Sequence, residues 1–342
     1  MLARIRIASG NSGFHGDGPL VIGLVNNMPD GALESTERRF RELLSIASNG
    51  CAVKLRFFSL PGLPRSEAGR SHIERHYEDI DELWSTRLDG LIVTGTEPHA
   101  LALPHEPYWP TLARLIDWAE EHTISTIWSC LAAHAAVLRR DGICRRSLRE
   151  KLSGVFECSK VGEHSIIAGT PSTWRVPHSR YHDLPEDALA SKGYQILLKS
   201  PEAGADLFVK QSKYLSIFVQ GHPEYEPEAL LREYRRDIRR FLTGEKDEYP
   251  PMPRGYFDAR TAEAFAELRR RALGNRAPNL LADFPTLESE IGLQDSWLEP
   301  AQRLYANWLS YLVEHQRSKY SRKKNLASAS RAARLSRLPS IG

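Results

Sequence analysis

The 342-residue sequence has only four cysteines, and no two of them form a CxxC pair. So few cysteines argue against a disulfide-stabilised scaffold and fit a reducing compartment, so we expect a cytoplasmic protein. No apolar run reaches the roughly 18 residues that a membrane-spanning helix needs. The N-terminal stretch MLARIRIASGNSGFHGDG has no long apolar segment of the kind found in secretory signals. These absences argue against a membrane or secreted protein.

An excess of charge of one sign is also lacking, except near the C-terminal end. The formal net charge is +3, but residues 317–337 hold eight Lys or Arg and no Asp or Glu. The rest of the chain is mildly acidic, so the basic isoelectric point does not indicate a nucleic-acid partner, and we expect none. Residues 317–342 contain few large apolar side chains and are predicted to be a basic disordered tail. Residues 1–18, rich in Gly and Ser, are predicted to be a flexible N-terminus.

What is present between these ends is an alternation of apolar runs and amphipathic stretches. The patterns predict buried strands at 20–26, 52–60, 89–95 and 123–129, and helices at 34–47, 108–122 and directly after Cys130. This alternation predicts an α/β fold with a doubly wound, mainly parallel sheet. Short antiparallel or mixed strands should follow, one of them at 164–169, and then helices at about 226–243, 259–275 and 297–316. We therefore assign residues 19–316 to one domain with helical C-terminal additions.

The stretch STIWSCLAAHAAVL (125–138) places Cys130 where a predicted strand passes into a helix. At such a turn the side chain stands at the end of the sheet, and the first N–H groups of the helix, beginning with that of Leu131, face it. Their partial positive charge lowers a thiol pKa and stabilises an oxyanion, as in a nucleophile elbow. A buried, unreactive cysteine is the alternative, and this stretch alone leaves both open.

A thiol nucleophile needs a base, and the stretch FVQGHPEYE (218–226) supplies a candidate. An extended run ends at Gly221, and His222 and Glu224 follow two residues apart. In an extended chain, residues two apart face the same side. Glu224 can then orient the His222 imidazole and stabilise its protonated form, as the third member of a triad does. A surface turn is the alternative interpretation of the His-Pro pair.

The order of these features, a strand, the cysteine, a helix and later the His-x-Glu stretch, resembles that of the class I glutamine amidotransferase-like fold. The finer resemblance is to the MetA family of homoserine O-acyltransferases, which includes the homoserine O-succinyltransferases. It is carried, in the family's order and close to its spacing, by DGLIVTG, YWP, EKLSGVFE, PHSRYHD, GHPEYE and NWLSYLV. The resemblance covers roughly residues 20–315.

This resemblance implies acyl transfer from acyl-CoA, a co-substrate, to the hydroxyl of L-homoserine in methionine biosynthesis. Cys130 would carry the acyl group, His222 would act as the base, and Glu224 would orient it. The oxyanion hole would use the N–H of Leu131 and one from a neighbouring loop. No bound cofactor or metal is implied, and a homodimer is expected. The family's amino-acid contacts fall on Lys151, Ser179 and Arg236.

Two loops depart from the family pattern. The loop after the first strand, NNMPDGALESTE, carries Asp30 and Gly31 where members have lysines, so a lysine there is not expected to assist the reaction. In the loop after Gly95, one position tunes the donor in the family, with glycine for succinyl and glutamate for acetyl. By spacing that position is His99. Because a protonated histidine can pair with a succinyl carboxylate, we favour succinyl-CoA over acetyl-CoA.

Other functions stay open on the sequence alone. The same fold supports a glutamine amidotransferase-like cysteine hydrolase, although no acceptor domain is evident. The acceptor could be another hydroxyl amino acid such as serine, or the chain could be a non-catalytic scaffold. The stretch HIERH (72–76) has a metal-compatible spacing of two histidines, but it lacks the glutamate position of H-E-x-x-H. We predict no metal site there.

Overall fold

The structure is a computed structural model that describes residues 18–285 and 296–335. Within them the chain forms a nine-stranded sheet with the order β2-β1-β3-β4-β9-β8-β7-β5-β6. The strands are β1 (Leu20–Val25), β2 (Val53–Phe58), β3 (Gly90–Val93), β4 (Ser125–Ser129), β5 (Arg146–Lys160), β6 (Thr173–Asp183), β7 (Gln195–Ser200), β8 (Gly204–Gln211) and β9 (Leu215–Val219). The helices are α1 (Leu33–Ala47), α2 (Glu67–His76), α3 (Ile80–Ser85), α4 (Trp109–His122), α5 (Leu131–Asp141), α6 (Glu186–Ser191), α7 (Ala229–Leu242), α8 (Ala259–Gly274) and α9 (Leu298–Leu335).

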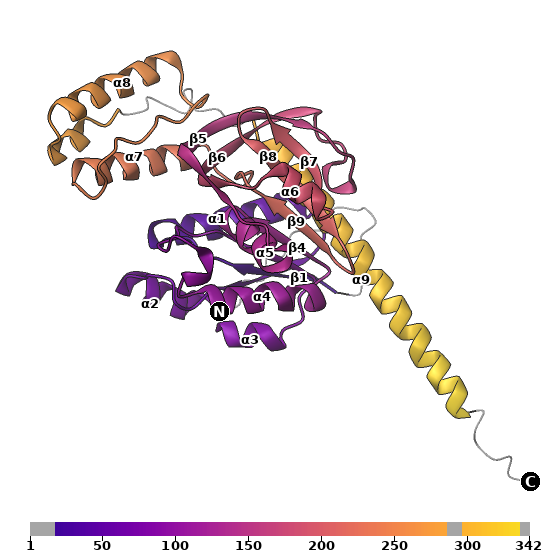
Figure 1. The fold of residues 1–342 in the computed structure, drawn as a ribbon. Coiled ribbons are helices and arrows are strands. Elements are labelled where there is room, and N and C mark those ends of the chain that lie inside the picture. Colours follow the sequence, from indigo (N-terminus) through magenta and orange to yellow (C-terminus); the bar gives the residue numbers. More distant parts are fainter. Residues whose placement is uncertain (1–17, 286–295, 336–342) are drawn as a thin grey trace, which may run out of the picture.

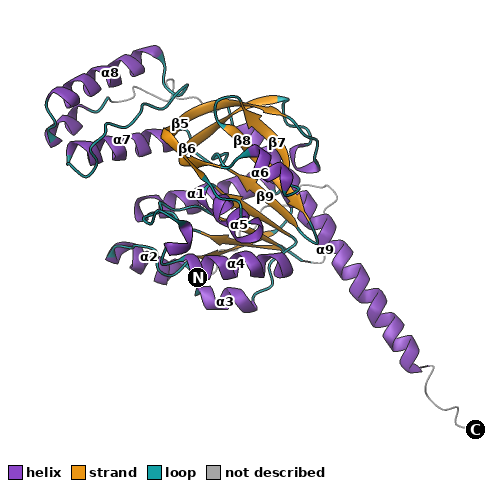
Figure 2. Cartoon of the chain, viewed as in Figure 1, coloured by secondary structure: helices purple, strands orange, loops and turns teal. Residues whose placement is uncertain are grey.

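The sheet has a parallel half and an antiparallel half (Figure 2). Strands β2, β1, β3, β4 and β9 run parallel, whereas β8, β7, β5 and β6 continue the sheet antiparallel. The predicted α/β class with a mainly parallel sheet and a mixed second half is confirmed. Strand β9 pairs directly with β4, with Ser129 opposite Val219. The segments that follow these two strands therefore start at the same edge of the sheet.

Helices cover both faces of the sheet, because the parallel strands are short runs whose residues are buried on both sides. On one face, α1 and α9 pack with residues such as Phe40 and Trp308 against Ile22 and Ile217. On the other face, α4 and α5 pack with residues such as Leu115 and Val137. Figure 1 shows α9 crossing the sheet and extending beyond it. The parallel strands that precede the functional loops are thus held from both sides.

Helices α7 and α8 form a separate layer beside the ends of β5 and β6 (Figure 1). They pack on each other through a small apolar cluster that includes Tyr234, Ile238, Phe241, Phe265 and Leu268. Side chains on the other face of α7 point back toward β5, where Lys151 contacts Asp237. This layer therefore supplies one wall of the region above the sheet.

Two segments differ from the sequence-based prediction. The predicted strand at 164–169 is instead a short 3-10 helix, Ser165–Ile167, because the His164 side chain accepts the N–H of Ile166 and Asn307 of α9 donates to the Ile166 carbonyl. The tail predicted to be disordered from Arg317 is helical to Leu335 as the end of α9. Its Ala, Leu, Lys and Arg residues have high helix propensity, which favours continuation of the helix. The predicted flexible N-terminus lies outside the described residues except for Gly18.

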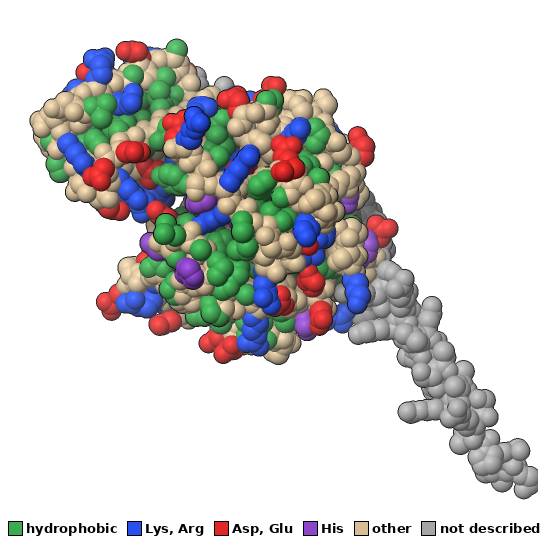
Figure 3. Space-filling view, in the orientation of Figure 1, with side chains coloured by type: hydrophobic (Ala, Val, Ile, Leu, Met, Phe, Trp, Pro, Cys, Tyr) green, Lys and Arg blue, Asp and Glu red, His purple; other side chains and the backbone are tan. Residues whose placement is uncertain are grey.

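The surface mixes charges of both signs. On the face drawn in Figure 3, Lys and Arg side chains are scattered among Asp and Glu. None of the helices in the described ranges combines the length and apolar character that crossing a membrane requires.

Candidate active site

Cys130 lies between the end of β4 and the first residue of α5. Its backbone has φ 53° and ψ −115°, a left-handed conformation that non-glycine residues rarely adopt. The Cys130 N–H donates to the Val219 carbonyl at 2.7 Å, which ties the turn to the neighbouring strand β9. A strained cysteine at a strand-to-helix turn has the geometry of a nucleophile elbow, because the turn presents the side chain above the sheet.

His222 and Glu224 follow β9, the strand beside β4. The His222 Nδ1 lies 2.9 Å from the Glu224 Oε1, and both residues are buried, with exposed fractions of 5% and 8%. The His222 N–H donates to the Pro177 carbonyl at 2.7 Å, and its ring stacks on Tyr225 with 4.1 Å between ring centroids. The Glu224 hydrogen bond and the stacked Tyr225 ring therefore fix the imidazole, and the bond to the Pro177 carbonyl holds the backbone of His222.

The charges around His222 set its protonation. Burial by itself lowers the pKa of His222, but the charges of Glu224 and Cys130 and their hydrogen bonds to the ring outweigh burial, so this pKa lies well above its ordinary value. A raised pKa favours transfer of a proton from the Cys130 thiol to the ring. Cys130, His222 and Glu224 thus interact with one another, and their catalytic roles stay a prediction.

The N–H of Leu131 opens helix α5 next to Cys130, and Gly95 lies against it. A Cβ on residue 95 would lie 2.9 Å from the Leu131 nitrogen and 3.2 Å from the Leu131 Cβ. Only glycine allows the loop after β3 to approach the elbow this closely. The space beside the first N–H of the helix therefore stays open to a small ligand group.

Lys151, Ser179 and Arg236 come from three elements and converge on two acidic residues of α7. The Lys151 Nζ lies 2.7 Å from Asp237 Oδ2 and 3.3 Å from Glu233 Oε2. The Ser179 hydroxyl donates to Glu233, and Arg236 bonds Asp237 at 2.8 Å. The predicted amino-acid contacts therefore form a connected cluster.

Glu233 is the central residue of this cluster, and the sequence pattern does not predict its role. Burial by itself raises its pKa, but Lys151, Arg236 and the hydroxyls of Ser179 and Tyr225 outweigh burial and lower the pKa of Glu233 to about 2. The carboxylate is therefore ionised at neutral pH. In LREYRRDIRRF it looks like one more surface charge of an amphipathic helix, and only the fold of α7 over β5 distinguishes it.

Two adjoining cavities meet at His222 and Arg236. The larger, of about 450 Å³, is lined by residues that include Cys130, Leu131, His99, Lys151 and Ser179. The smaller, of about 300 Å³, lies between α1 and α7 and reaches Glu224. The structure thus brings all eight predicted site residues to the walls of one continuous region.

His99 lies at the rim of the larger cavity with an exposed side chain. Its backbone N–H and that of Ala100 both donate to Glu106 Oε1 at 2.7 Å. Glu106 is itself buried, with an exposed fraction of 2%. A buried carboxylate therefore fixes the backbone of this loop, while the imidazole of His99 stays at the entrance.

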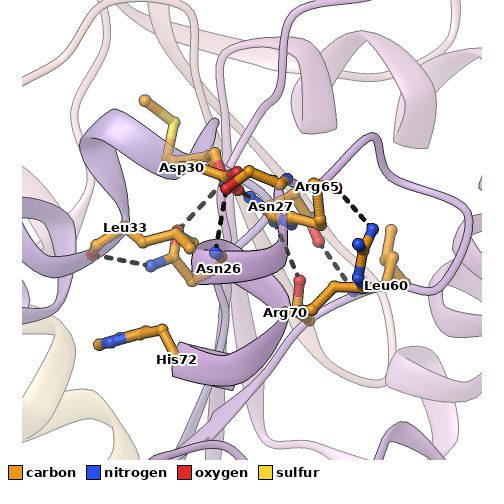
Figure 4. Close-up of polar contacts among 12 residues, drawn as sticks. Asn26, Asn27, Asp30, Leu33, Leu60, Arg65, Arg70 and His72 are labelled. Carbon is orange, nitrogen blue, oxygen red and sulfur yellow. Dashed lines mark hydrogen bonds and ion pairs between the residues drawn. The ribbon is translucent and has the colours of Figure 1, made fainter. Parts of the chain in front are cut away.

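The loop that departs from the family pattern has a structural network of its own (Figure 4). Asp30 accepts the N–H of Ser66 at 2.7 Å and pairs with Arg65 at 3.1 Å. Asn27 donates to the Thr94 carbonyl and accepts the N–H of Leu60, which joins the ends of β1, β2 and β3. Asp30 is thus engaged in holding the loop.

Of the two histidines of HIERH, His72 is held by hydrogen bonding and His76 lies against its ring. The His72 Nε2 lies 2.6 Å from the buried carboxylate of Glu37, which also accepts from the Tyr77 hydroxyl. Across the described part of the chain, no group of three or more His, Cys, Asp or Glu side chains has an arrangement suited to a metal ion.

Comparison with known proteins adds to this geometry. The sequence profile of the homoserine O-succinyltransferase family matches residues 6–320. The chain is 49% identical to a homoserine O-succinyltransferase of Rhodopseudomonas palustris, over 85% of this chain and 88% of that one. It is 47% identical to one from Methylorubrum extorquens, over 86% and 88%. Among solved structures, a glutamine amidotransferase of Methylobacillus flagellatus aligns with a TM-score of 0.49 and 16% identity over 86% of this chain and 94% of that one.

The α/β fold and the family match together define an acyltransferase enzyme, as the sequence predicts. More particularly, the chain belongs to the homoserine O-succinyltransferase family. The family's name agrees with the predicted preference for succinyl over acetyl.

Proposed function

We propose that this enzyme transfers a succinyl group from succinyl-CoA to the hydroxyl of L-homoserine, in methionine biosynthesis, through a thioester on Cys130. The observation that carries the proposal is the row of Cys130, His222 and Glu224 beside a cavity that also contains the Lys151 and Ser179 cluster. A nucleophile with its base and a separate polar cluster for an amino acid are the two parts that a two-step acyl transfer requires.

In the first step His222 takes the thiol proton of Cys130, and the thiolate attacks the thioester carbonyl of succinyl-CoA. The resulting oxyanion accepts a hydrogen bond from the Leu131 N–H, a contribution of about 3 kcal/mol per donor in comparable sites. When the tetrahedral intermediate collapses, the bond to the CoA sulfur breaks and His222 returns its proton to that sulfur. Free CoA leaves, and the succinyl group stays on Cys130.

In the second step the homoserine hydroxyl gives its proton to His222 and its oxygen attacks the new thioester. Collapse of the second intermediate breaks the bond to Cys130, which recovers the proton from His222. Glu224 keeps the imidazole in one orientation during both steps and stabilises its protonated form. The protein ends each cycle unchanged, and no bound cofactor takes part.

The cluster on α7 suits a zwitterionic amino acid. The Arg236 side chain is 36% exposed, so its guanidinium can donate to the α-carboxylate of homoserine while it keeps its bond to Asp237. The ionised Glu233 can accept the α-ammonium group, and Lys151 balances its charge. Opposite charges at the two ends of the cluster would fix the direction in which the acceptor enters.

Intact-mass measurement tests the proposal. The protein is incubated with succinyl-CoA without acceptor, and we expect an adduct of the succinyl mass that Cys130→Ala lacks. Homoserine should discharge the adduct, and serine should do so far more slowly. No adduct from any acyl-CoA would overturn the proposal, and release of ammonia from glutamine would instead favour a cysteine hydrolase.

The chain is also proposed to act as a homodimer in the cytoplasm, as the sequence analysis expects. Light scattering of the purified full-length chain tests the proposed homodimer, and a mass of one chain at micromolar concentration would contradict it. Fractionation of cells that express the chain tests the proposed cytoplasmic location.

A further inference from the structure

The cavity that contains Cys130 is lined by several arginines, and most of them are already paired. Arg180 donates to Asp183 and to backbone carbonyls, and Arg240 makes two bonds to Glu97, at 2.8 and 3.0 Å. Arg236 bonds Asp237. These guanidinium groups have partners before any ligand enters.

Arg145 differs from them. It lies just before β5, lines the same cavity as Cys130, and is partly buried. Within the described ranges of the chain, no hydrogen bond or ion pair reaches its guanidinium at contact distance. Burial lowers the pKa of Arg145, and the charges of Tyr108, Glu106 and Cys130 offset this only in part. The cavity therefore holds a partly buried cation near Cys130, without an anion in contact with it.

The nearby carboxylate of Glu106 is not a contact partner of the Arg145 guanidinium. Glu106 is buried and does not line the cavity, and its Oε1 is occupied by the N–H groups of His99 and Ala100. It acts on Arg145 through charge without a contact that neutralises it. A partly buried guanidinium without a contact partner gains most from an anion that arrives with a ligand.

We propose that Arg145 binds the free carboxylate of the succinyl group, both in succinyl-CoA and in the acyl-enzyme on Cys130. This inference rests on the proposed function. The carboxylate of a succinyl group is separated from the reacting carbonyl by two methylene groups, and Arg145 and Cys130 line one cavity within the reach of each other's charge. A planar guanidinium donates two parallel N–H bonds to the oxygens of a carboxylate. Arg145 is then the residue that selects a dicarboxylic acyl donor, whereas His99 stands at the rim.

The test compares succinyl-CoA with butyryl-CoA, which has nearly the same length and shape but no carboxylate. Steady-state kcat/KM is measured for both donors, at saturating homoserine, in wild type, Arg145→Met, Arg145→Lys and Arg149→Met. Arg149 is exposed, lies outside both cavities and serves as the matched control. We expect Arg145→Met to lower kcat/KM for succinyl-CoA by about 10- to 100-fold, the worth of a charge-assisted pair, and to change that for butyryl-CoA by less than about 3-fold.

Arg145→Lys should lose less than Arg145→Met, because the charge remains and the bidentate geometry does not. Activity with butyryl-CoA shows that each variant folds and reacts. An equal loss for both donors in Arg145→Met, or a loss for succinyl-CoA below about 3-fold, would overturn the inference. The variant His99→Ala is measured in the same way. If the ratio of kcat/KM for succinyl-CoA to that for butyryl-CoA changes more in His99→Ala than in Arg145→Met, His99 and not Arg145 selects the acyl donor. Wild-type protein that reacts with no acyl-CoA would instead overturn the proposed function.

Discussion

Replacing Glu224 by glutamine removes one charge from the buried row and keeps the size of the side chain. In the native chain, the His222 and Glu224 side chains are 6% and 10% exposed and lie 2.9 Å apart. Solvent therefore screens this pair little, and the carboxylate contributes both to the raised pKa of His222 and to its orientation.

The size of the effect follows from this burial. Removing one partner of a buried ion pair costs about 3–5 kcal/mol. If that loss falls on the imidazolium formed in each transition state, kcat drops by about 150- to 5,000-fold. Because burial alone lowers the pKa of His222, this pKa should also fall in Glu224→Gln. The acidic limb of the pH profile should then move to lower pH.

The stability of the protein should change with pH in a defined direction. A group whose pKa is raised on folding stabilises the fold fully below its unfolded pKa, about 6.5 for histidine, and this stabilisation is lost as the pH rises through the folded pKa. The difference in free energy of unfolding between wild type and Glu224→Gln should therefore be largest near pH 6 and shrink as the pH rises through the raised pKa of His222, as measured by urea denaturation.

The assay follows CoA release with both substrates across the pH range. Glu228→Gln is the control, since its side chain makes no capping hydrogen bond at the start of α7 and lines neither cavity. A Glu224→Gln enzyme with kcat within about 3-fold of wild type and an unmoved acidic limb would refute the role assigned to the pair.

Three further substitutions test the fold and the site. Gly95→Ala should lower kcat by about 100-fold, because its Cβ would lie 2.9 Å from the Leu131 nitrogen and displace the N–H that faces the oxyanion. Because this contact is with backbone, the substitution should also cost about 1–3 kcal/mol of unfolding free energy; unchanged turnover would contradict the assigned role of the Leu131 N–H. Asp30→Ala should cost about 1–2 kcal/mol of unfolding free energy, because the side chain loses its ion pair with Arg65 and its hydrogen bond from the Ser66 N–H. The KM for homoserine should stay within about 2-fold of wild type, and a large rise in this KM would place the loop in the acceptor site. Gly90→Ala should cost about 1–3 kcal/mol in chemical denaturation, because its Cβ would lie 2.7 Å from Leu312 and 2.8 Å from Trp308; an unchanged midpoint would show that α9 can shift freely.

Much of the fold can be predicted from apolar patterning. The runs at β1, β3 and β4 are short, continuous and closed by polar residues, which is typical of strands buried on both faces. Strand β6 was harder to predict, because TWRVPHSRYHD contains a proline and several charges and has no clear alternation. The apolar run at Ile166 and Ile167 is buried, but a local side-chain hydrogen bond and α9 give it a helical turn.

Some residues of the candidate site can be predicted from the sequence and others cannot. Cys130 and His222 can be predicted because each follows an apolar strand, and the pairing of β4 with β9 then brings them together. Glu233 and Arg145 could not be predicted, since each lies in a stretch rich in charges that reads as solvated surface. Their environment depends on how α7 and the start of β5 fold over the sheet, which is a long-range property.

The last helix has a consequence for biosynthesis. Trp308 of α9 donates to Ser125 on the strand that leads to Cys130, and Gln316 donates to Asp89 just before β3. The face of the central strands that α1 begins to cover is therefore fully covered only after α9 has left the ribosome. Until α9 has been synthesised, a nascent chain exposes apolar side chains of these strands that α9 later covers, so the strand that leads to Cys130 should reach its final packing only at that stage.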